Sequence, residues 1–184
     1  MIELYAIAQR PGPPLPDIAP LRELACGELG AICGTAAEES EITEDALWRH
    51  ERIVEAVMET RDLLPVRYGT RFAGDEQAVD VVAARSGTLK AALERVRGAV
   101  ELSLRVRARE PDVSIDVHAS LQPLARESMT RPAPDEGELL RAAYLVERDR
   151  VPEVRDEVAR LQHEHPELSL LLTGPWPPYS FVER

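Results

Sequence analysis

The histidines and cysteines are the residues of this chain best suited to bind a metal, but their spacing does not assemble a site. The 184-residue chain has four histidines and two cysteines. His163 and His165 precede Pro166 at the end of a predicted helix, where one face cannot present both rings. Cys26 and Cys33 lack the second cysteine or histidine pair that a zinc site of this kind requires. We therefore expect no metal, no cofactor and two buried, reduced thiols.

The residues that could carry catalysis are equally isolated. His50 lies on the apolar stripe of a predicted helix, so we interpret it as a packed, hydrogen-bonded histidine rather than a general base. Gly27, Gly30 and Gly34 flank a strand and lack the spacing of a phosphate-binding loop. No serine lies in a Gly-x-Ser-x-Gly elbow, and most carboxylates fall on exposed helix faces. The sequence therefore predicts a protein that is not an enzyme.

Arg67, Tyr68, Gly69 and Thr70 form the first group with a binding hypothesis. On the polar face of a predicted strand, Arg67 and Gly69 would leave the backbone approachable beside a guanidinium group. Alternatively, Arg67 pairs with a nearby carboxylate and Gly69 makes room for a helix. Both interpretations stay open from the sequence.

The second group is the C-terminal tail, with Trp176, Pro177, Pro178, Tyr179 and Phe181. Prolines fix φ and remove backbone donors, so the tail is stiff. Aromatic residues make up only 4% of the chain, yet three of them stand on this segment. Tryptophan and tyrosine are favoured interface anchors, so the tail is a candidate surface for a partner. Alternatively, it packs back on the domain and holds it closed.

Composition excludes some classes of partner. The formal net charge is −11, whereas nucleic-acid binding requires a cationic surface. No apolar run approaches the ~20 residues that span a bilayer, and no secretory signal is visible at the N-terminus. We therefore expect a soluble, cytoplasmic protein that contacts neither nucleic acid nor membrane.

The apolar pattern predicts strands and helices without the regular alternation of a doubly wound sheet, which indicates an α+β fold. Strands are expected at residues 2–8, 29–36, 63–72, 100–107, 139–147 and 167–173. Helices are expected after caps at Thr43, Asp75 and Ser86, from His118 to Met129 and after Pro152, with a short one from Leu21 to Ala25. From about residue 98 the order is close to a ferredoxin-like pattern that lacks one strand.

Several segments, taken in order, resemble those of the gas vesicle protein family GvpL/GvpF. One short match such as Gly-Thr or Tyr-Leu-Val would carry no information, but the ordered set with a long terminal match is specific. The matching segments are Ile2–Ile7, Gly30–Gly34, His50–Glu55, Leu64–Phe72, Gly98–Leu104, Ala143–Val146 and Leu172–Val182.

This resemblance implies two domains, 1–97 and 98–184, the second a modified ferredoxin-like fold that carries the tail. It also implies a gas vesicle accessory protein, either a minor structural component or an assembly factor. Such a protein would bind the small, hydrophobic shell protein and other accessory proteins during gas vesicle formation. Strand addition at a sheet edge and the aromatic tail are the binding modes that we expect.

Two other functions remain open from the sequence. The chain could bind or convert a small molecule, with Arg67 and His50 lining a pocket for an anionic ligand. It could also be a structural homo-oligomer without a client.

Overall fold

The chain forms two compact units. The computed structural model describes residues 1–36, 43–108, 116–132 and 137–182. Unit 1 comprises Met1–Arg97 and Pro177–Arg184, and unit 2 comprises Gly98–Trp176. The sequence analysis placed residues 177–184 with the second domain, whereas the structure groups them with unit 1. Both units combine helices with antiparallel strands, so the α+β class is confirmed.

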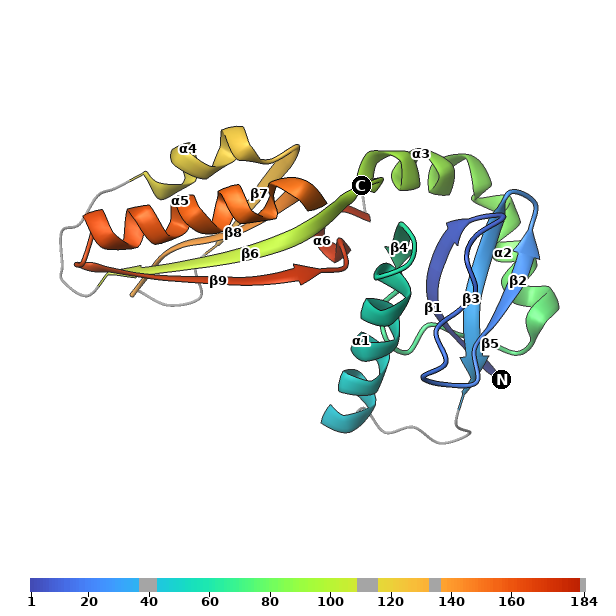
Figure 1. The fold of residues 1–184 in the computed structure, drawn as a ribbon. Coiled ribbons are helices and arrows are strands. Elements are labelled where there is room, and N and C mark those ends of the chain that lie inside the picture. Colours follow the sequence, from blue (N-terminus) through green and yellow to red (C-terminus); the bar gives the residue numbers. More distant parts are fainter. Residues whose placement is uncertain (37–42, 109–115, 133–136, 183–184) are drawn as a thin grey trace. The chain divides into compact units, whose positions relative to one another are not determined.

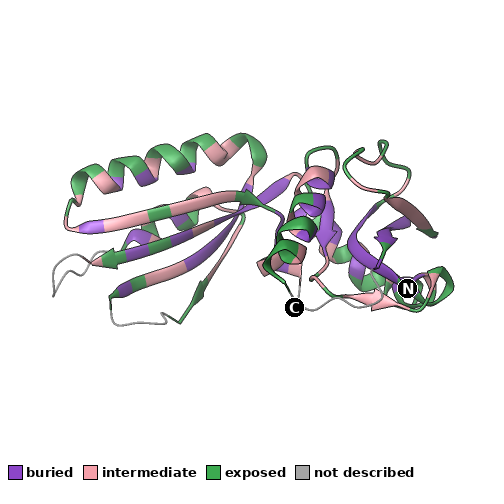
Figure 2. Ribbon diagram, turned by 90° about the horizontal axis from the view of Figure 1, so that it is seen from below, coloured by how far each residue is buried: buried purple, intermediate pink, exposed green. Residues whose placement is uncertain are grey.

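Strand β1 is the centre of the sheet in unit 1. β1 (Ile2–Gln9) pairs antiparallel with β3 (Leu29–Thr35), β4 (Leu63–Pro65) and β5 (Arg71–Phe72), and β2 (Arg22–Cys26) pairs with β3. Seven of the eight residues of β1 are buried, as the purple ribbon shows (Figure 2). Because side chains alternate between the faces of a strand, both faces of β1 must be covered.

Helix α1 (Glu44–Met58) covers one of these faces. The Thr43 hydroxyl accepts a hydrogen bond from Ala46 N at 3.2 Å, which confirms the predicted cap. The buried residues recur at helical spacing on the side toward the sheet, and they are His50, Ile53, Val54, Val57 and Met58.

Helices α2 (Asp75–Ala84) and α3 (Ser86–Val96) cover the opposite face of β1 (Figure 1). Val82 and Leu89 line a cavity together with Leu4 of β1, while His50 of α1 contacts Glu3 on the other face. Neither helix has the predicted side-chain cap, because Asp75 and Ser86 are the first helical residues.

Unit 2 is a four-stranded antiparallel sheet in the order β7-β8-β6-β9. Its strands are β6 (Ala99–Ala108), β7 (Glu127–Arg131), β8 (Glu138–Glu147) and β9 (Leu168–Trp176). Helix α4 (Val117–Leu121) and helix α5 (Val151–Glu164) lie on the same side of the sheet (Figure 1). Short 3-10 turns η1 (Gln122–Leu124) and η2 (Arg148–Arg150) follow α4 and β8. Unit 1 also contains the short C-terminal helix α6 (Tyr179–Val182).

One face of the unit 2 sheet forms an apolar core against these helices. The predicted alternation of β6 is confirmed, because Leu102, Leu104 and Val106 point into this core. Tyr144 is fully buried there, and its hydroxyl lies 2.9 Å from His118 Nδ1. Figure 2 shows the exposed face of α5 in green.

Three predicted elements are wrong. The expected helix from Leu21 to Ala25 is strand β2, because the two-residue turn at Gly27 (φ +68°) folds it back on β3. The expected strand 63–72 is interrupted between β4 and β5. The expected helix from His118 to Met129 ends at Leu121, and β7 supplies the strand that the sequence pattern lacked.

Candidate functional site

Arg67, Tyr68, Gly69 and Thr70 form a tight turn between β4 and β5. Thr70 N donates to Arg67 O at 3.2 Å, and the Thr70 hydroxyl donates to the same carbonyl at 2.9 Å. Gly69 has a φ of +82°, a conformation that favours glycine. The predicted alternation of faces is therefore wrong here, and backbone geometry explains the glycine.

A buried pair of side chains, Glu3 and His50, holds this turn against the sheet. His50 is 1% exposed, and its Nε2 donates to Val66 O at 2.7 Å. His50 Nδ1 lies 3.1 Å from Glu3 Oε1, which also accepts from Gly69 N at 3.5 Å. The structure confirms that His50 is a packed, hydrogen-bonded residue. Its bonds to Glu3 of β1 and to Val66, which directly precedes the turn, position the turn.

The carboxylate of Glu3 is stabilised in its ionised form. Burial, the largest single influence, would raise the pKa of Glu3, whereas the hydrogen bond and charge of His50 lower it. The bond from Gly69 N and the charge of Arg71 act in the same direction. The pKa of Glu3 is therefore lowered, and its carboxylate is ionised near neutral pH.

Most of the C-terminal tail is packed into unit 1. Pro177 and Pro178 are buried, and Phe181 is 1% exposed. The Arg95 guanidinium donates to the carbonyl of Phe181, and α6 lies against α3 and β4. Tyr179 is half-buried, and burial followed by the charge of Glu51 raises its pKa, which keeps the phenol neutral. This part of the tail closes unit 1.

Trp176 belongs instead to unit 2, at the end of β9. It pairs with Glu101 of β6, and its indole nitrogen donates to the Thr173 hydroxyl at 3.2 Å. Its side chain is 37% exposed. The five tail residues therefore do not form one continuous aromatic surface.

The turn and the tail meet at a cavity of about 660 Å³ within unit 1. Arg67 and Thr70 of the turn line it, as do Tyr179 and Val182 of the tail. The remaining walls are mainly apolar and come from β1, the segment around β4 and β5, α2 and α3: Leu4, Ile7, Leu64, Pro65, Val66, Phe72, Val81, Val82, Arg85, Thr88, Leu89 and Ala92. This cavity is the candidate binding site.

A β-bulge in β1 places two of these wall residues on the same face. Leu4 pairs with Cys33 and Ala6 with Ile32, so Tyr5 has no direct partner across the ladder. The extra residue shifts the alternation of side chains. Leu4 and Ile7, three positions apart, therefore both face the cavity.

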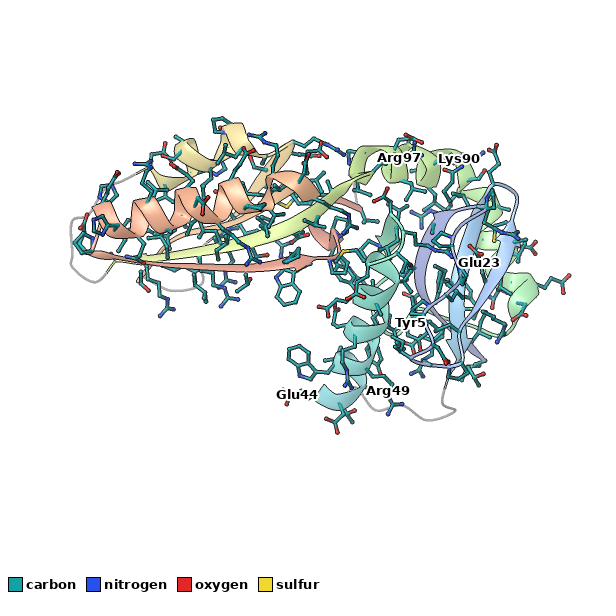
Figure 3. All side chains as sticks on the ribbon, viewed as in Figure 1. Tyr5, Glu23, Glu44, Arg49, Lys90 and Arg97 are labelled. Atoms are coloured by element: carbon teal, nitrogen blue, oxygen red, sulfur yellow. The ribbon has the colours of Figure 1, made fainter. Side chains whose placement is uncertain are left out.

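A second, smaller cavity of about 130 Å³ lies on the α1 face and is polar. Its walls include Glu3, Tyr5, Arg49, His50 and Tyr68. Figure 3 labels Tyr5 on β1 and Arg49 on α1, the two elements that enclose it. The turn thus presents its residues to two cavities, with Tyr68 on the small one. His50 and Arg67 line different cavities, unlike the single anion pocket considered from the sequence.

The contribution of helices α2 and α3 to the cavity was missed from the sequence. Leu89 and Ala92 are spaced as an amphipathic stripe, which is the pattern of an ordinary core face. Val81 was not singled out, although it is 40% exposed and lines the cavity. The sequence offered no signal that separates Val81 from the core residues of its helix.

Neither a metal cluster nor a membrane helix is found in the part of the chain that the structure describes. Within residues 1–36, 43–108, 116–132 and 137–182, no three histidine, cysteine, aspartate or glutamate side chains gather as metal ligands. No helix in the same ranges is long and apolar enough to cross a membrane.

Comparison with known proteins gives one consistent family. The family model for the gas vesicle synthesis protein GvpL/GvpF matches residues 3–116 and 108–183. The chain is similar to gas vesicle protein F2 of Halobacterium salinarum, with 29% identity over 78% of this chain and 70% of that protein. It is also similar to gas vesicle protein F of a Streptomyces species, with 26% identity and 98% of both chains covered.

Solved structures share the same fold. The crystal structure of GvpF from Anabaena sp. PCC7120 has a TM-score of 0.85, with 18% identity, and covers 100% of this chain and 96% of that one. GvpF from Microcystis aeruginosa gives a TM-score of 0.83, also with 18% identity, and covers 100% and 99%.

The fold is the two-unit α+β architecture of these GvpF structures. The chain belongs to the GvpL/GvpF family, because the family model covers almost its whole length. Membership of this family supports an accessory role in gas vesicles.

Proposed function

We propose that this chain acts in gas vesicle formation by binding the hydrophobic shell protein and other accessory proteins, and that it catalyses no reaction. It would be a minor structural component or an assembly factor in the cytoplasm or on the vesicle. Family membership supports this proposal. The matched relatives are themselves named as gas vesicle proteins.

The observation that carries the proposal is the apolar cavity of unit 1. Val81 is 40% exposed and lines it, so the cavity opens at the surface of α2. Each Å² of apolar client surface buried there would contribute about 25 cal/mol. A protein with net charge −11 can stay dispersed while it offers this apolar site to an aggregation-prone client.

Strand addition, one of the two modes expected from the sequence, is less well supported than this cavity. At the edge strand β9, the Gln162 side chain donates to Leu168 O at 2.9 Å and accepts from Leu170 N at 3.0 Å. Arg155 donates to Gly174 O at 3.0 Å on the same strand. In unit 1, α6 lies against β4, which ends at Pro65. These contacts cover the β9 and β4 edges, whereas β2 and β7 are the other edge strands of the two sheets.

The test is co-expression of the tagged chain with a gas vesicle shell protein, followed by capture at moderate and high salt. Burial of apolar surface is screened little by salt, so capture should survive. Val81→Glu places a carboxylate in the cavity at an exposed position and should abolish capture without unfolding the chain.

The matched control is Ile18→Glu, because Ile18 is 53% exposed and does not line the cavity. If Val81→Glu captures the shell protein as well as wild type does, the cavity is not the binding site. If wild type is folded and captures nothing, direct binding of the shell protein is wrong.

A small-molecule role is the alternative that the cavity also fits, because its volume lies within the range of ligand pockets. A ligand that binds only the folded state raises the melting temperature. Reproducible stabilisation by one compound of a metabolite panel would favour this alternative over protein binding.

We further propose that unit 2 is a modified ferredoxin-like fold. The chain order β6, α4, β7, β8, α5, β9 supports it, as does the sheet order β7-β8-β6-β9 with both helices on one face. A solution structure of residues 98–176 in the full chain with a different strand order would contradict this assignment.

A further inference from the structure

The charged residues that line the unit 1 cavity are arginines, although the chain has more acidic than basic residues. We propose that the cavity binds an apolar α-helical segment of a protein partner, whose apolar face is flanked by carboxylates that pair with Arg67 and Arg85. The inference rests on the proposed function and specifies the chemistry of the segment recognised.

Charge complementarity carries the first step. The chain has 33 acidic and 22 basic residues, so a surface chosen at random is expected to be acidic. The described residues that line the cavity include Arg67 and Arg85 but no aspartate or glutamate. Guanidinium groups bind carboxylates through paired hydrogen bonds, which makes arginine the preferred residue for this task.

The positions of the two arginines carry the second step. Arg67 belongs to the turn after β4, and Arg85 lies at the junction of α2 and α3. Both are exposed, although most of the other residues that line the cavity are apolar. A fatty acid has one carboxylate at one end of its chain. A peptide with an acidic residue on either side of its apolar face matches two separate cations better.

The backbone around the cavity favours a helix over a strand. α6 lies against β4, and Pro65 has no N–H to offer a pairing strand. Side chains of the partner must therefore supply most contacts. An amphipathic helix does this with apolar residues at i, i+3, i+4 and i+7, as in other helix-in-groove complexes.

The experiment uses the full chain and labelled synthetic peptides of about 18 residues, long enough to form a helix. One peptide has leucines at helical spacing with glutamates on both flanks, and the other has lysines in place of the glutamates. Fluorescence anisotropy should show tighter binding of the acidic peptide by about tenfold or more.

Charge reversal tests the assignment of the arginines. In the double variant Arg67→Glu/Arg85→Glu the preference should invert toward the lysine peptide. Arg85 follows the last turn of α2 and precedes the first turn of α3, so the two helix dipoles act on a carboxylate there in opposite directions. Folding should therefore be retained, which circular dichroism checks. Arg52→Glu is the control, because Arg52 is exposed on α1 and does not line the cavity.

Each outcome decides between the inference and its alternatives. Equal binding of both peptides by wild type, or a preference unchanged by the double reversal, would overturn the inference. So would competition by dodecanoate, a C12 fatty acid, at concentrations comparable to the peptide. Shell-protein capture that persists in the double variant with no peptide preference would sink this inference and leave the proposed function standing. If the wild-type chain does not capture the shell protein, the proposed function itself is wrong.

Discussion

Glu3 Oε1 lies 3.1 Å from His50 Nδ1 in the interior of unit 1, and this contact joins β1 to α1. The same carboxylate oxygen accepts from Gly69 N, and the other ring nitrogen donates to Val66 O. The pair therefore fixes the backbone that carries Arg67 and Thr70 to the large cavity.

Removing His50 should destabilise the chain strongly. His50→Ala leaves the Glu3 carboxylate buried without its partner, and breaking a buried pair in this way costs about 3–5 kcal/mol. Urea denaturation followed by circular dichroism measures the change. The double variant Glu3→Gln/His50→Ala should lose less than the sum of the two single variants, and additive losses would show that the groups are not coupled.

Stability should depend on pH through Glu3. Its pKa is lowered in the folded state, so the stabilisation it gives is fully present above the pKa of the unfolded chain. That stabilisation is lost as pH falls through the folded-state value. The difference in unfolding free energy between wild type and Glu3→Gln should be present at neutral pH and shrink as pH falls below about pH 4. A difference that stays constant at acid pH would contradict the role of the ionised carboxylate.

Gly69→Ala should destabilise the turn, because an L side chain is strained at its φ of +82°. We expect a loss of about 1 kcal/mol in unfolding free energy. Gly87→Ala is the matched control: Gly87 lies in α3 with open space around it, so alanine should be neutral or stabilising there. Equal effects of the two substitutions would contradict the assigned turn.

Phe181→Ala should unfold the tail from unit 1, because its side chain is 1% exposed. Large-to-small changes at such positions cost about 3–5 kcal/mol. Trp176→Ala, at a position 37% exposed on unit 2, should cost far less. Thermal unfolding of both variants checks the contrast. Similar losses would mean that the tail does not divide between the units as described.

Local patterns predicted the elements whose residues contact neighbours in a regular way. Thr43 with two acids after it predicted the start of α1, and the alternation from Val100 to Val106 predicted β6. The Arg67–Thr70 turn could not be predicted from alternation, since Val66, Tyr68 and Thr70 repeat at period two by chance. Gly69 was the residue that indicated a turn, but only its positive φ in the structure shows why glycine is favoured there.

The cavity could be predicted only in part, because it depends on contacts distant in sequence. The turn and the tail were each selected as binding candidates, yet Arg67 and Tyr179 are more than a hundred residues apart and nothing local joins them. The bulge at Tyr5 and the approach of Val81 are likewise consequences of sheet pairing and helix packing. Sequence periodicity contains no information about such long-range placement.

The hydrogen bonds from Gln162 to β9 also cover one edge of the unit 2 sheet, which matters for the proposed contact with a self-assembling client. An open edge strand can act as a template on which further chains grow. With Leu168 O and Leu170 N already engaged, β9 is a poor seed for such growth. A chain with this edge covered would contact the proposed client through side chains rather than through strands added at β9.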